Sequence, residues 1–175
     1  MTRAIAQPHE RVLEMIDVAN APLHIVLVEP EIPPNTGNVA RLCAATGCAL
    51  HLVEPLGFSI DDRALKRAGL DYWHALGVVI HPSLEAFLDR TAARRRWYFS
   101  THAQRRYAEV TFEHGDMLVF GRETKGLPKE LVMREPERAL RIPMRPQSVR
   151  SINLSTAVGI ATYGALASLG FPGLT

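Results

Sequence analysis

The sequence has only two cysteines and no long apolar run. Because Cys43 and Cys48 are the only thiols in 175 residues, a disulfide framework is excluded and a thiolate zinc site lacks ligands; we expect both to be reduced core residues. No apolar stretch approaches the roughly 18 to 20 residues that a membrane span needs, and the first 20 residues carry charges where an export signal needs an apolar block. These absences predict a cytoplasmic protein without a membrane partner.

Common nucleotide-binding and catalytic signatures are also missing. There is no GxGxxG after the first apolar run, no GxxxxGK[ST] and no GxSxG, so a dinucleotide site, a P-loop and a serine hydrolase elbow have no support. The seven histidines are scattered without metal-ligand spacing. His24 and His51 lie beside or within apolar runs, and we interpret them as half-buried strand residues rather than ligands. No metal is therefore expected.

Lysine is scarce as well, since 17 of the 20 positive side chains are arginine. The planar guanidinium suits phosphate, which favours a nucleic-acid or nucleotide partner, but a GC-rich genome would produce the same bias. Residues 90–106 hold six arginines and no carboxylate. This stretch is either a phosphate-contacting surface, whose binding would fall steeply with salt, or a solvated helix end.

Apolar runs of strand length alternate with segments of helical period from residue 23 onward. Strands are predicted at 23–29, 49–55, 77–81, 97–101, 116–121 and 139–144. Helices are predicted between them, with capping residues or glycines at their ends: one ending at Gly47, then 61–69, 83–94, a short one from Pro128, and 153–169. Continuous apolar strands separated by helices are typical of a mostly parallel sheet with helices on both faces. We therefore expect an α/β fold.

One domain accounts for most of the chain. With 47% hydrophobic and 22% charged residues, 175 residues are enough for a single buried core. Residues 1–22 form an N-terminal extension with apolar positions at helical spacing, which predicts a helix that packs on the domain or frays. The domain itself is expected to span 23–175.

Three loops that follow predicted strands carry polar residues suited to a ligand, because ligands of parallel sheets collect at the carboxyl ends of the strands. The loop 29–41 places Asn35, Asn38 and Arg41 at a helix start, although Asn35 could be simply an N-cap and Arg41 a surface side chain. The segment 120–128 has a charged cluster between two glycines, which indicates a ligand-binding loop, although the segment could be a plain turn between a strand and a helix. The segment 142–164 places Ser151, Asn153 and Ser155 around another helix start, where a serine or asparagine could be merely a cap.

Together the three loops resemble the SpoU branch of the SPOUT superfamily of RNA methyltransferases. The shared motifs are N-x-G-N-x-x-R at 35–41, F-G-x-E-x-x-G-L-P at 120–128, and I-P-M followed by R-S-x-N-L-S within 142–155. The motifs occur in family order, and the resemblance as a whole covers residues 23–173. The segments EPEIPPNTGN and GLDYW are most similar to the subgroup that methylates the wobble ribose of leucine tRNAs at C34 or U34.

The resemblance implies a C-terminal deep trefoil knot that holds S-adenosylmethionine and a homodimer packed through the knot region. It assigns cofactor-binding roles to Phe99, Gly121, Ile142 and Ser151. It further implies that Arg41 lies by the reacting ribose, that Asn35, Glu123 and Asn153 hold the loops and the substrate with support from Ser155, and that Tyr163 lies near the site. The implied partner is RNA, not DNA.

Departures from the family pattern affect fine substrate contacts. Arg122 and Gly164 stand where close relatives often have Pro and Glu, and the loop 145–150 is one residue longer. Two alternatives stay open: a ribose methyltransferase for another tRNA position or for ribosomal RNA, and a non-catalytic RNA-binding knot protein. The intact motif residues argue against the second.

Overall fold

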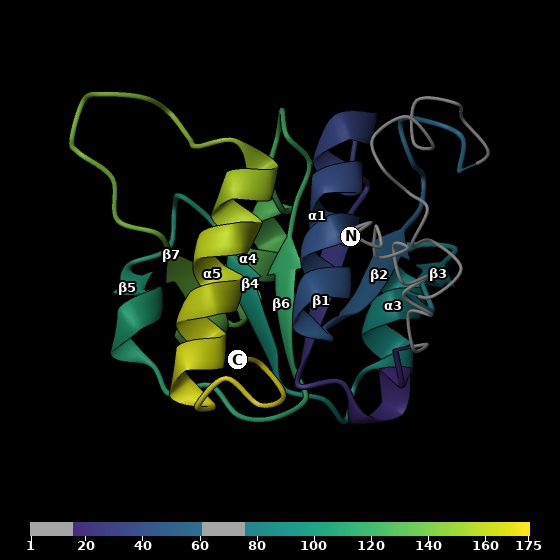
Figure 1. Cartoon of the computed structure of the whole chain (residues 1–175). Helices are drawn as coiled ribbons and strands as arrows, with labels where there is room; N and C mark the ends of the chain where they lie inside the picture. The colour runs from purple at the N-terminus through teal and green to yellow at the C-terminus, as the bar shows by residue number, and fades with distance from the viewer. Residues whose placement is uncertain (1–15, 61–75) are drawn as a thin grey trace, which may run out of the picture.

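The computed structural model describes residues 16–60 and 76–175. In this part of the chain seven strands form one parallel sheet in the order β3-β2-β1-β6-β4-β7-β5 (Figure 1). The strands are β1 (Leu23–Val28), β2 (Ala49–Val53), β3 (Val79–His81), β4 (Arg96–Phe99), β5 (Arg105–Arg106), β6 (Asp116–Phe120) and β7 (Ala139–Arg141). The predicted parallel α/β sheet is confirmed.

Helices cover both faces of this sheet. The α-helices are α1 (Pro33–Thr46), α3 (Leu84–Arg90), α4 (Lys129–Arg134) and α5 (Leu154–Ser168), and the 3-10 turns are η1 (Val18–Asn20), η3 (Tyr107–Glu109) and η4 (Pro136–Arg138). α1 and α5 lie side by side on the near face in Figure 1, and α3 and α4 lie behind the sheet. No helix in the described part of the chain is both long and apolar enough to span a bilayer.

The alternation of side chains along the strands divides the core into two layers. Leu23, Ile25 and Leu27 point to the face that α1 and α5 cover. Val26 and Val28, from the same strand, point to the opposite face, which α3 and α4 cover. Because both faces are buried, β1 is apolar at nearly every position, which explains why it shows no alternation in the sequence.

The helix boundaries follow the predicted capping chemistry. The Ser83 hydroxyl accepts a hydrogen bond from the backbone N–H of Ala86 at 3.1 Å and caps α3. Gly47, with φ of 70°, ends α1 in the left-handed conformation that glycine adopts readily. Cys43 and Cys48 are free and buried, as expected.

Some expectations differ from the structure. Five of the six predicted strands end one to three residues earlier than predicted, because the chain leaves the sheet there to build loops, whereas β3 ends at the predicted residue and begins two residues later. The two-residue strand β5 lies in a segment where the sequence predicts no strand. The helix predicted at 61–69 lies outside the described residues. Of the helical extension predicted at 1–22, residues 1–15 also lie outside them, and the described part contains only the 3-10 turn η1. The implied trefoil knot stays a prediction.

The arginine-rich stretch 90–106 does not form one basic surface. Arg95 donates to both carboxylate oxygens of the buried Asp116 at 2.7 Å. Arg96 donates to the carbonyl oxygen of Leu88 at 2.9 Å. These contacts lie at the amino end of β4, away from the strand ends where a ligand of this fold binds. Arg95 and Arg96 therefore stabilise the fold, and a phosphate-binding role for them is not supported.

Candidate active site

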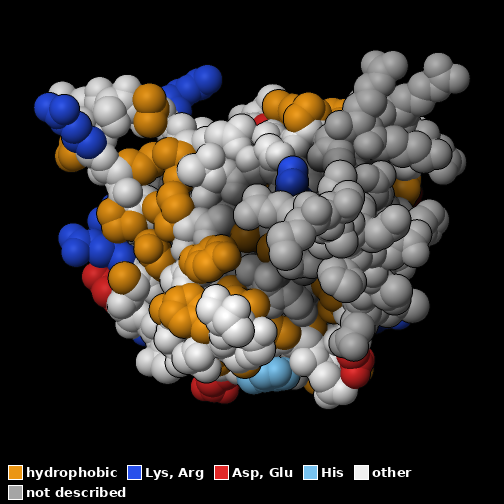
Figure 2. Space-filling model, in the orientation of Figure 1, with side chains coloured by type: hydrophobic (Ala, Val, Ile, Leu, Met, Phe, Trp, Pro, Cys, Tyr) orange, Lys and Arg blue, Asp and Glu red, His pale blue; other side chains and the backbone are white. Residues whose placement is uncertain are grey.

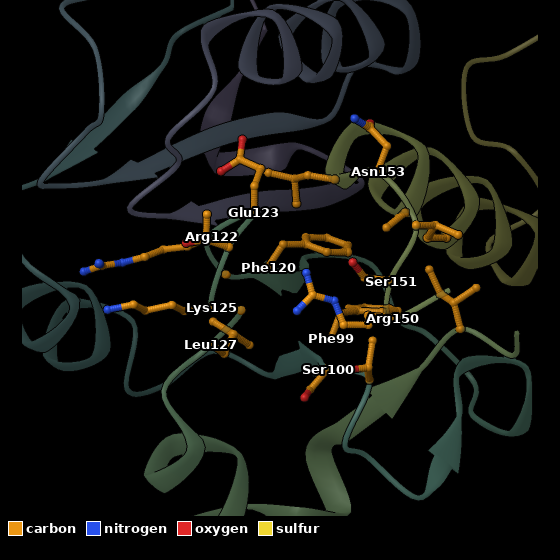
Figure 3. Close-up of a pocket in the computed structure, with 18 of the residues that line it drawn as sticks. Phe99, Ser100, Phe120, Arg122, Glu123, Lys125, Leu127, Arg150, Ser151 and Asn153 are labelled. Carbon is orange, nitrogen blue, oxygen red and sulfur yellow. The ribbon is translucent and has the colours of Figure 1, made fainter. Parts of the chain in front are cut away.

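An open pocket of about 780 Å³ lies at the carboxyl ends of the central strands. Residues from all three predicted loops line it, together with Phe99 at the end of β4: Asn35, Gly121, Glu123, Ile142, Ser151 and Asn153. Figure 3 shows Phe99, Phe120, Arg150 and Ser151 gathered at the centre, with Glu123 and Asn153 toward α1 and α5. Seven of the nine predicted site residues therefore surround one cavity, as expected for a parallel sheet.

Two aromatic rings form an apolar part of this pocket. Phe99 ends β4 and Phe120 ends β6, and these strands are neighbours in the sheet. Their ring centroids are 4.7 Å apart and the ring planes differ by 15°, so the rings are stacked. Both side chains are buried at the base of an otherwise open cavity, which gives the pocket an apolar surface for a flat ligand group.

The loop after β6 is tightly closed. The backbone N–H of Gly126 donates to the carbonyl oxygen of Arg122 at 2.9 Å. A Cβ atom at Gly121 would collide with the backbone of Gly126 and Leu127 on the opposite side of the turn. Glycine is therefore required at Gly121 for this close approach of two chain segments. Every residue of this loop from 121 to 127 lines the pocket.

Glu123 joins this loop to the start of α1. Its carboxylate accepts hydrogen bonds from the backbone N–H groups of Glu31 at 2.8 Å and Ile32 at 3.1 Å, and from the side-chain amide of Asn35 at 3.0 Å. Ile32 is the N-cap of α1 and has no side-chain cap of its own. A carboxylate distant in the chain thus stabilises the positive end of the helix.

Asn35 and Asn153 complete a network among the three motifs. The side-chain amide of Asn153 donates to Oδ1 of Asn35 at 2.9 Å. Oδ1 of Asn153 accepts from the Ser155 hydroxyl at 2.7 Å and from the backbone N–H of Thr156 at 3.3 Å, which caps α5. Asn35 is buried inside α1 and is not its N-cap. The capping alternative is therefore wrong for Asn35, while Asn153 both caps a helix and bonds across the site.

Arg41 and Tyr163 lie apart from the pocket within one chain. Arg41 is exposed on α1, six residues beyond Asn35, which corresponds to about 9 Å along the helix axis. Tyr163 is 48% exposed on α5 and lies near Phe171, with ring centroids 6.4 Å apart. Neither side chain lines the cavity that holds Glu123. Their predicted roles therefore need a second molecule or a large substrate.

One departure from the family pattern has a structural explanation. A Cβ atom at Gly164 would lie 2.5 Å from ring carbon Cε2 of Tyr107. The Tyr107 ring therefore occupies the space that a larger residue at this position of α5 would need. Tyr107 belongs to η3. Because Gly164 has no side chain, this turn can pack against α5.

Several pocket residues were not singled out from the sequence. Arg150 and His102 line the cavity, and Glu29 and Glu31 bind the loop after β6 from outside it. All four belong to loops or strand ends at the carboxyl edge of the sheet. The rule that ligands bind at this edge could have identified them.

Three histidines form a buried chain away from the pocket. Nδ1 of His24 lies 2.9 Å from Nε2 of His51, and Nδ1 of His51 lies 3.0 Å from Nε2 of His81. Burial, together with the positive charge of Arg94, lowers the pKa of His24 to about 4, and burial lowers that of His51 to about 3. His24 and His51 are thus buried rather than half-buried. Within residues 16–60 and 76–175, no group of His, Cys, Asp and Glu has the arrangement of a metal site.

Comparisons with known proteins show the family of the chain. The model of the SpoU rRNA Methylase family matches residues 22–163. The chain is 52% identical to the tRNA (cytidine(34)-2′-O)-methyltransferase of Saccharophagus degradans, covering 86% of this chain and 97% of that protein. It is 49% identical to the protein of the same name from Escherichia coli K12, covering 86% and 96%.

Solved structures show the same fold. A structure concerned with the 2-OH methylation of C/U34 on tRNA superposes with a TM-score of 0.79 at 48% identity, covering 85% of this chain and 96% of that one. The SpoU methyltransferase AviRb from Streptomyces viridochromogenes, in complex with AdoMet, superposes with a TM-score of 0.75 at 24% identity, covering 88% and 63%. The family match spans most of the chain, and two relatives share about half of its residues. The protein belongs to the SpoU methylase family.

Proposed function

We propose that this protein transfers the methyl group of S-adenosyl-L-methionine to the ribose 2′-OH of the wobble nucleotide, C34 or U34, of leucine tRNAs. The observation that carries the proposal is the network of Asn35, Glu123 and Asn153 around one pocket, in a chain about half identical to two tRNA (cytidine(34)-2′-O)-methyltransferases. The choice of leucine tRNAs rests on the similarity of EPEIPPNTGN and GLDYW to that subgroup.

The pocket fits S-adenosylmethionine in size and in chemistry. Its volume of about 780 Å³ lies within the roughly 300 to 1,000 Å³ of small-molecule sites. The stacked Phe99 and Phe120 offer an apolar surface for a purine, and the close approach of Gly121 to Gly126 holds the loop in the form that lines the cavity. The AdoMet complex of AviRb supports the same cofactor, since that protein shares this fold.

Residues of this chain are proposed to hold the cofactor and the reacting ribose. Phe99, Gly121, Ile142 and Ser151 would hold S-adenosylmethionine, which when bound supplies a methyl group on a sulfonium and needs no metal. The network of Glu123 with α1 and α5 fixes the loops around it, so that a ribose oxygen can be aligned with the methyl group.

Arg41 is proposed to bind RNA rather than act as a base. A guanidinium stays protonated in water, so it cannot accept the ribose proton. An exposed arginine can instead hold a phosphate next to the target nucleotide and stabilise the negative charge that develops on the 2′-oxygen. The proton then leaves to solvent or to a nearby group.

A homodimer would bring Arg41 and Tyr163 to a cofactor pocket. Ile160 and Tyr163 are exposed large apolar side chains on α5, and Phe171 is another beside Tyr163. Figure 2 shows hydrophobic side chains gathered over α5 on the face that also carries α1. Apolar surface of this kind is typical of a protein interface. We therefore infer that two copies pack through this face.

The rim of the pocket is basic and suits a polyanion. Arg145 and Arg150 are exposed on the loop between β7 and α5, where Figure 2 shows positive side chains standing out from the surface. Lys125 is exposed on the loop after β6. Positive charges next to the cofactor pocket favour binding of RNA phosphates.

A methyl-transfer assay tests the proposal. The protein is incubated with labelled S-adenosylmethionine and, in separate reactions, total unmodified tRNA or unmodified ribosomal RNA, and the labelled nucleoside is then mapped. Label at the 2′-O of nucleotide 34 of leucine tRNAs is expected. Label at another tRNA position, or only in ribosomal RNA, would show a ribose methyltransferase with a different substrate. Binding of tRNA without any methyl transfer would show a non-catalytic RNA-binding protein.

A further inference from the structure

Glu29 has an unusual backbone conformation at the edge of the pocket. It directly follows β1 and has a φ of 50°, in the left-handed region. For a residue with a Cβ atom this conformation costs on the order of 1 kcal/mol. Such a conformation persists only where surrounding contacts enforce it, and it occurs most often at functional sites.

Two contacts enforce this conformation. The backbone N–H of Glu29 donates to the carbonyl oxygen of Val53 at 2.8 Å, which extends the pairing of β1 with β2 by one residue. The carboxylate of Glu29 forms an ion pair with the guanidinium of Arg122, on the loop that closes the pocket. The Glu29 side chain is 18% exposed and that of Arg122 is 36% exposed, so the pair is partly removed from water.

A second pair of contacts joins the same two segments. The carboxylate of Glu31 accepts hydrogen bonds from the Thr124 backbone N–H at 3.0 Å and from the Thr124 hydroxyl at 2.8 Å. Glu123 bonds in the opposite direction, to the backbone of Glu31 and Ile32. Residues 29–32 and 122–124, here called the clasp, are therefore held together from both sides.

Arg122 is one of the residues that line the pocket, but its side chain is directed away from the pocket's centre. In Figure 3 its side chain runs outward from the loop, away from the centre of the pocket where Phe99 and Phe120 lie. Its charge is directed at Glu29. The ion pair therefore acts on the position of the loop that carries Gly121 and Glu123, and does not act on a bound molecule directly.

We propose that Glu29 and Arg122 are positioning residues that hold the loop 121–126 closed on α1 and thereby set the affinity of the cofactor pocket. This inference rests on the proposed function for the identity of the ligand. When the pair is lost, the loop spends part of its time away from the start of α1, and the apparent dissociation constant rises in inverse proportion to the fraction of molecules whose loop is closed. Once the loop is closed, the groups in the pocket are unchanged, so turnover is nearly unaffected.

The test uses Arg122→Gln, Glu29→Gln and the double variant in the full chain. Calorimetric titration with S-adenosylmethionine gives the dissociation constant, and steady-state assays separate KM from kcat. We expect each single variant to raise the dissociation constant and KM about fivefold, as for a partly buried ion pair, with kcat within about twofold of wild type. The double variant should be no worse than either single one, because both remove the same pair.

Two controls separate positioning from general destabilisation. Arg122→Lys keeps the charge and should restore most of the affinity. Arg134→Gln removes an exposed arginine of α4 and should behave as wild type. If Glu29→Gln does not fold well, Arg122→Gln tests the same ion pair from its more exposed partner, with the melting temperature measured alongside.

Amide hydrogen exchange provides a readout that needs no ligand. The Thr124 amide, which donates to the Glu31 carboxylate across the clasp, should exchange faster in Arg122→Gln than in wild type. Unchanged exchange together with unchanged affinity would overturn the proposal, and so would a loss of kcat at constant KM. If wild type binds no S-adenosylmethionine, the proposed function fails, while the exchange rate still decides whether the clasp holds the loop.

Discussion

The side-chain amide of Asn153 donates a hydrogen bond to Oδ1 of Asn35 over 2.9 Å, although 118 residues separate the two in the chain. Asn35 in turn donates to Glu123 at 3.0 Å. The three motifs therefore meet through one buried amide, and the starts of α1 and α5 are fixed relative to the pocket loop. Asn35 can satisfy both partners because an amide has a donor and an acceptor on the same group.

Replacement of Asn35 should disrupt this network. Asn35→Asp keeps an acceptor for Asn153 but removes the donor to Glu123 and places two carboxylates together, so it should be more harmful than Asn35→Ala. We expect Asn35→Ala to lower the free energy of unfolding by about 1 to 3 kcal/mol, since two hydrogen bonds of a buried group are lost, and to reduce methyl transfer strongly. Urea unfolding and the methyl-transfer assay measure both effects.

Asn38→Ala is the matched control for Asn35, because Asn38 is exposed on the same helix. It should keep the stability of wild type within about 0.5 kcal/mol. An Asn35→Asp variant as stable and as active as wild type would show that the network has no role.

Gly121 should tolerate no side chain. In Gly121→Ala the added methyl group meets the backbone of Gly126 and Leu127, which cannot move without opening the loop, so affinity for S-adenosylmethionine should fall more than tenfold. Gly126→Ala is the comparison: Gly126 has a φ of 67° but open space around its Cβ position, and the cost is only the backbone strain of about 1 kcal/mol. Equal affinities for the two variants would contradict this account of the loop.

Stability should depend on pH through the buried histidine chain. A guanidinium only donates, so Arg94, at 2.9 Å from Nε2 of His24, makes that nitrogen an acceptor and Nδ1–H the donor to His51, which then donates to His81. All three imidazoles are neutral in this arrangement. Burial lowers the pKa of His81 as well, and the charged or titratable groups that act on the chain are Arg90, Arg94 and His114.

The lowered pKa values of these histidines make the protein less stable as the pH falls. Below the ordinary pKa of 6.5 the unfolded chain binds protons at these positions, while folded His24 stays neutral down to a pKa of about 4. The free energy of unfolding should therefore fall as pH falls from about 6.5 to 4, by at most about 1.4 kcal/mol per pH unit for each histidine. Chemical unfolding at a series of pH values measures this slope. His51→Gln should flatten it, whereas His102→Gln, at an exposed position, should not; equal slopes in all three proteins would contradict the assignment.

Much of the fold can be read from the sequence because its causes are local. A few neighbouring residues are enough to predict the strands β1 and β2, the helix start at Ser83 and the end of α1 at its glycine. The position of β6 between β1 and β4 cannot be read in this way, since it depends on pairing between strands about 90 residues apart. β5 is too short to produce a pattern.

The site divides in the same manner. Placement of Phe99, Gly121 and Ser151 at one edge follows from their positions after strands, which the sequence shows. The bonds of Asn35 to Glu123 and Asn153 depend on three loops meeting, and an asparagine near a helix start is equally typical of a cap. The contacts of Glu29 with Arg122 and of Arg95 with Asp116 join residues distant in the chain, so no local sequence pattern predicts them.

A subunit-mixing experiment tests whether Arg41 acts across the proposed dimer. Arg41→Ala should keep binding of S-adenosylmethionine and lose transfer, while Asn153→Ala should damage the pocket. If the residues serve one site from different subunits, a heterodimer of the two variants has one site with both residues intact and one with neither. Up to about half of wild-type activity per heterodimer should then return, by counting of sites in a two-fold dimer. Verified subunit exchange without recovered activity would place both residues in the same subunit's site.

The central claim is that the methyl group goes to the 2′-oxygen of nucleotide 34. Two leucine tRNAs that differ only at this position, one with the ordinary ribose and one with a 2′-deoxyribose, are offered to the protein with labelled S-adenosylmethionine. The account predicts about one methyl group per molecule of the first tRNA and none on the second, although both should bind with similar affinity because the phosphates are unchanged. Equal labelling of the two tRNAs would contradict it.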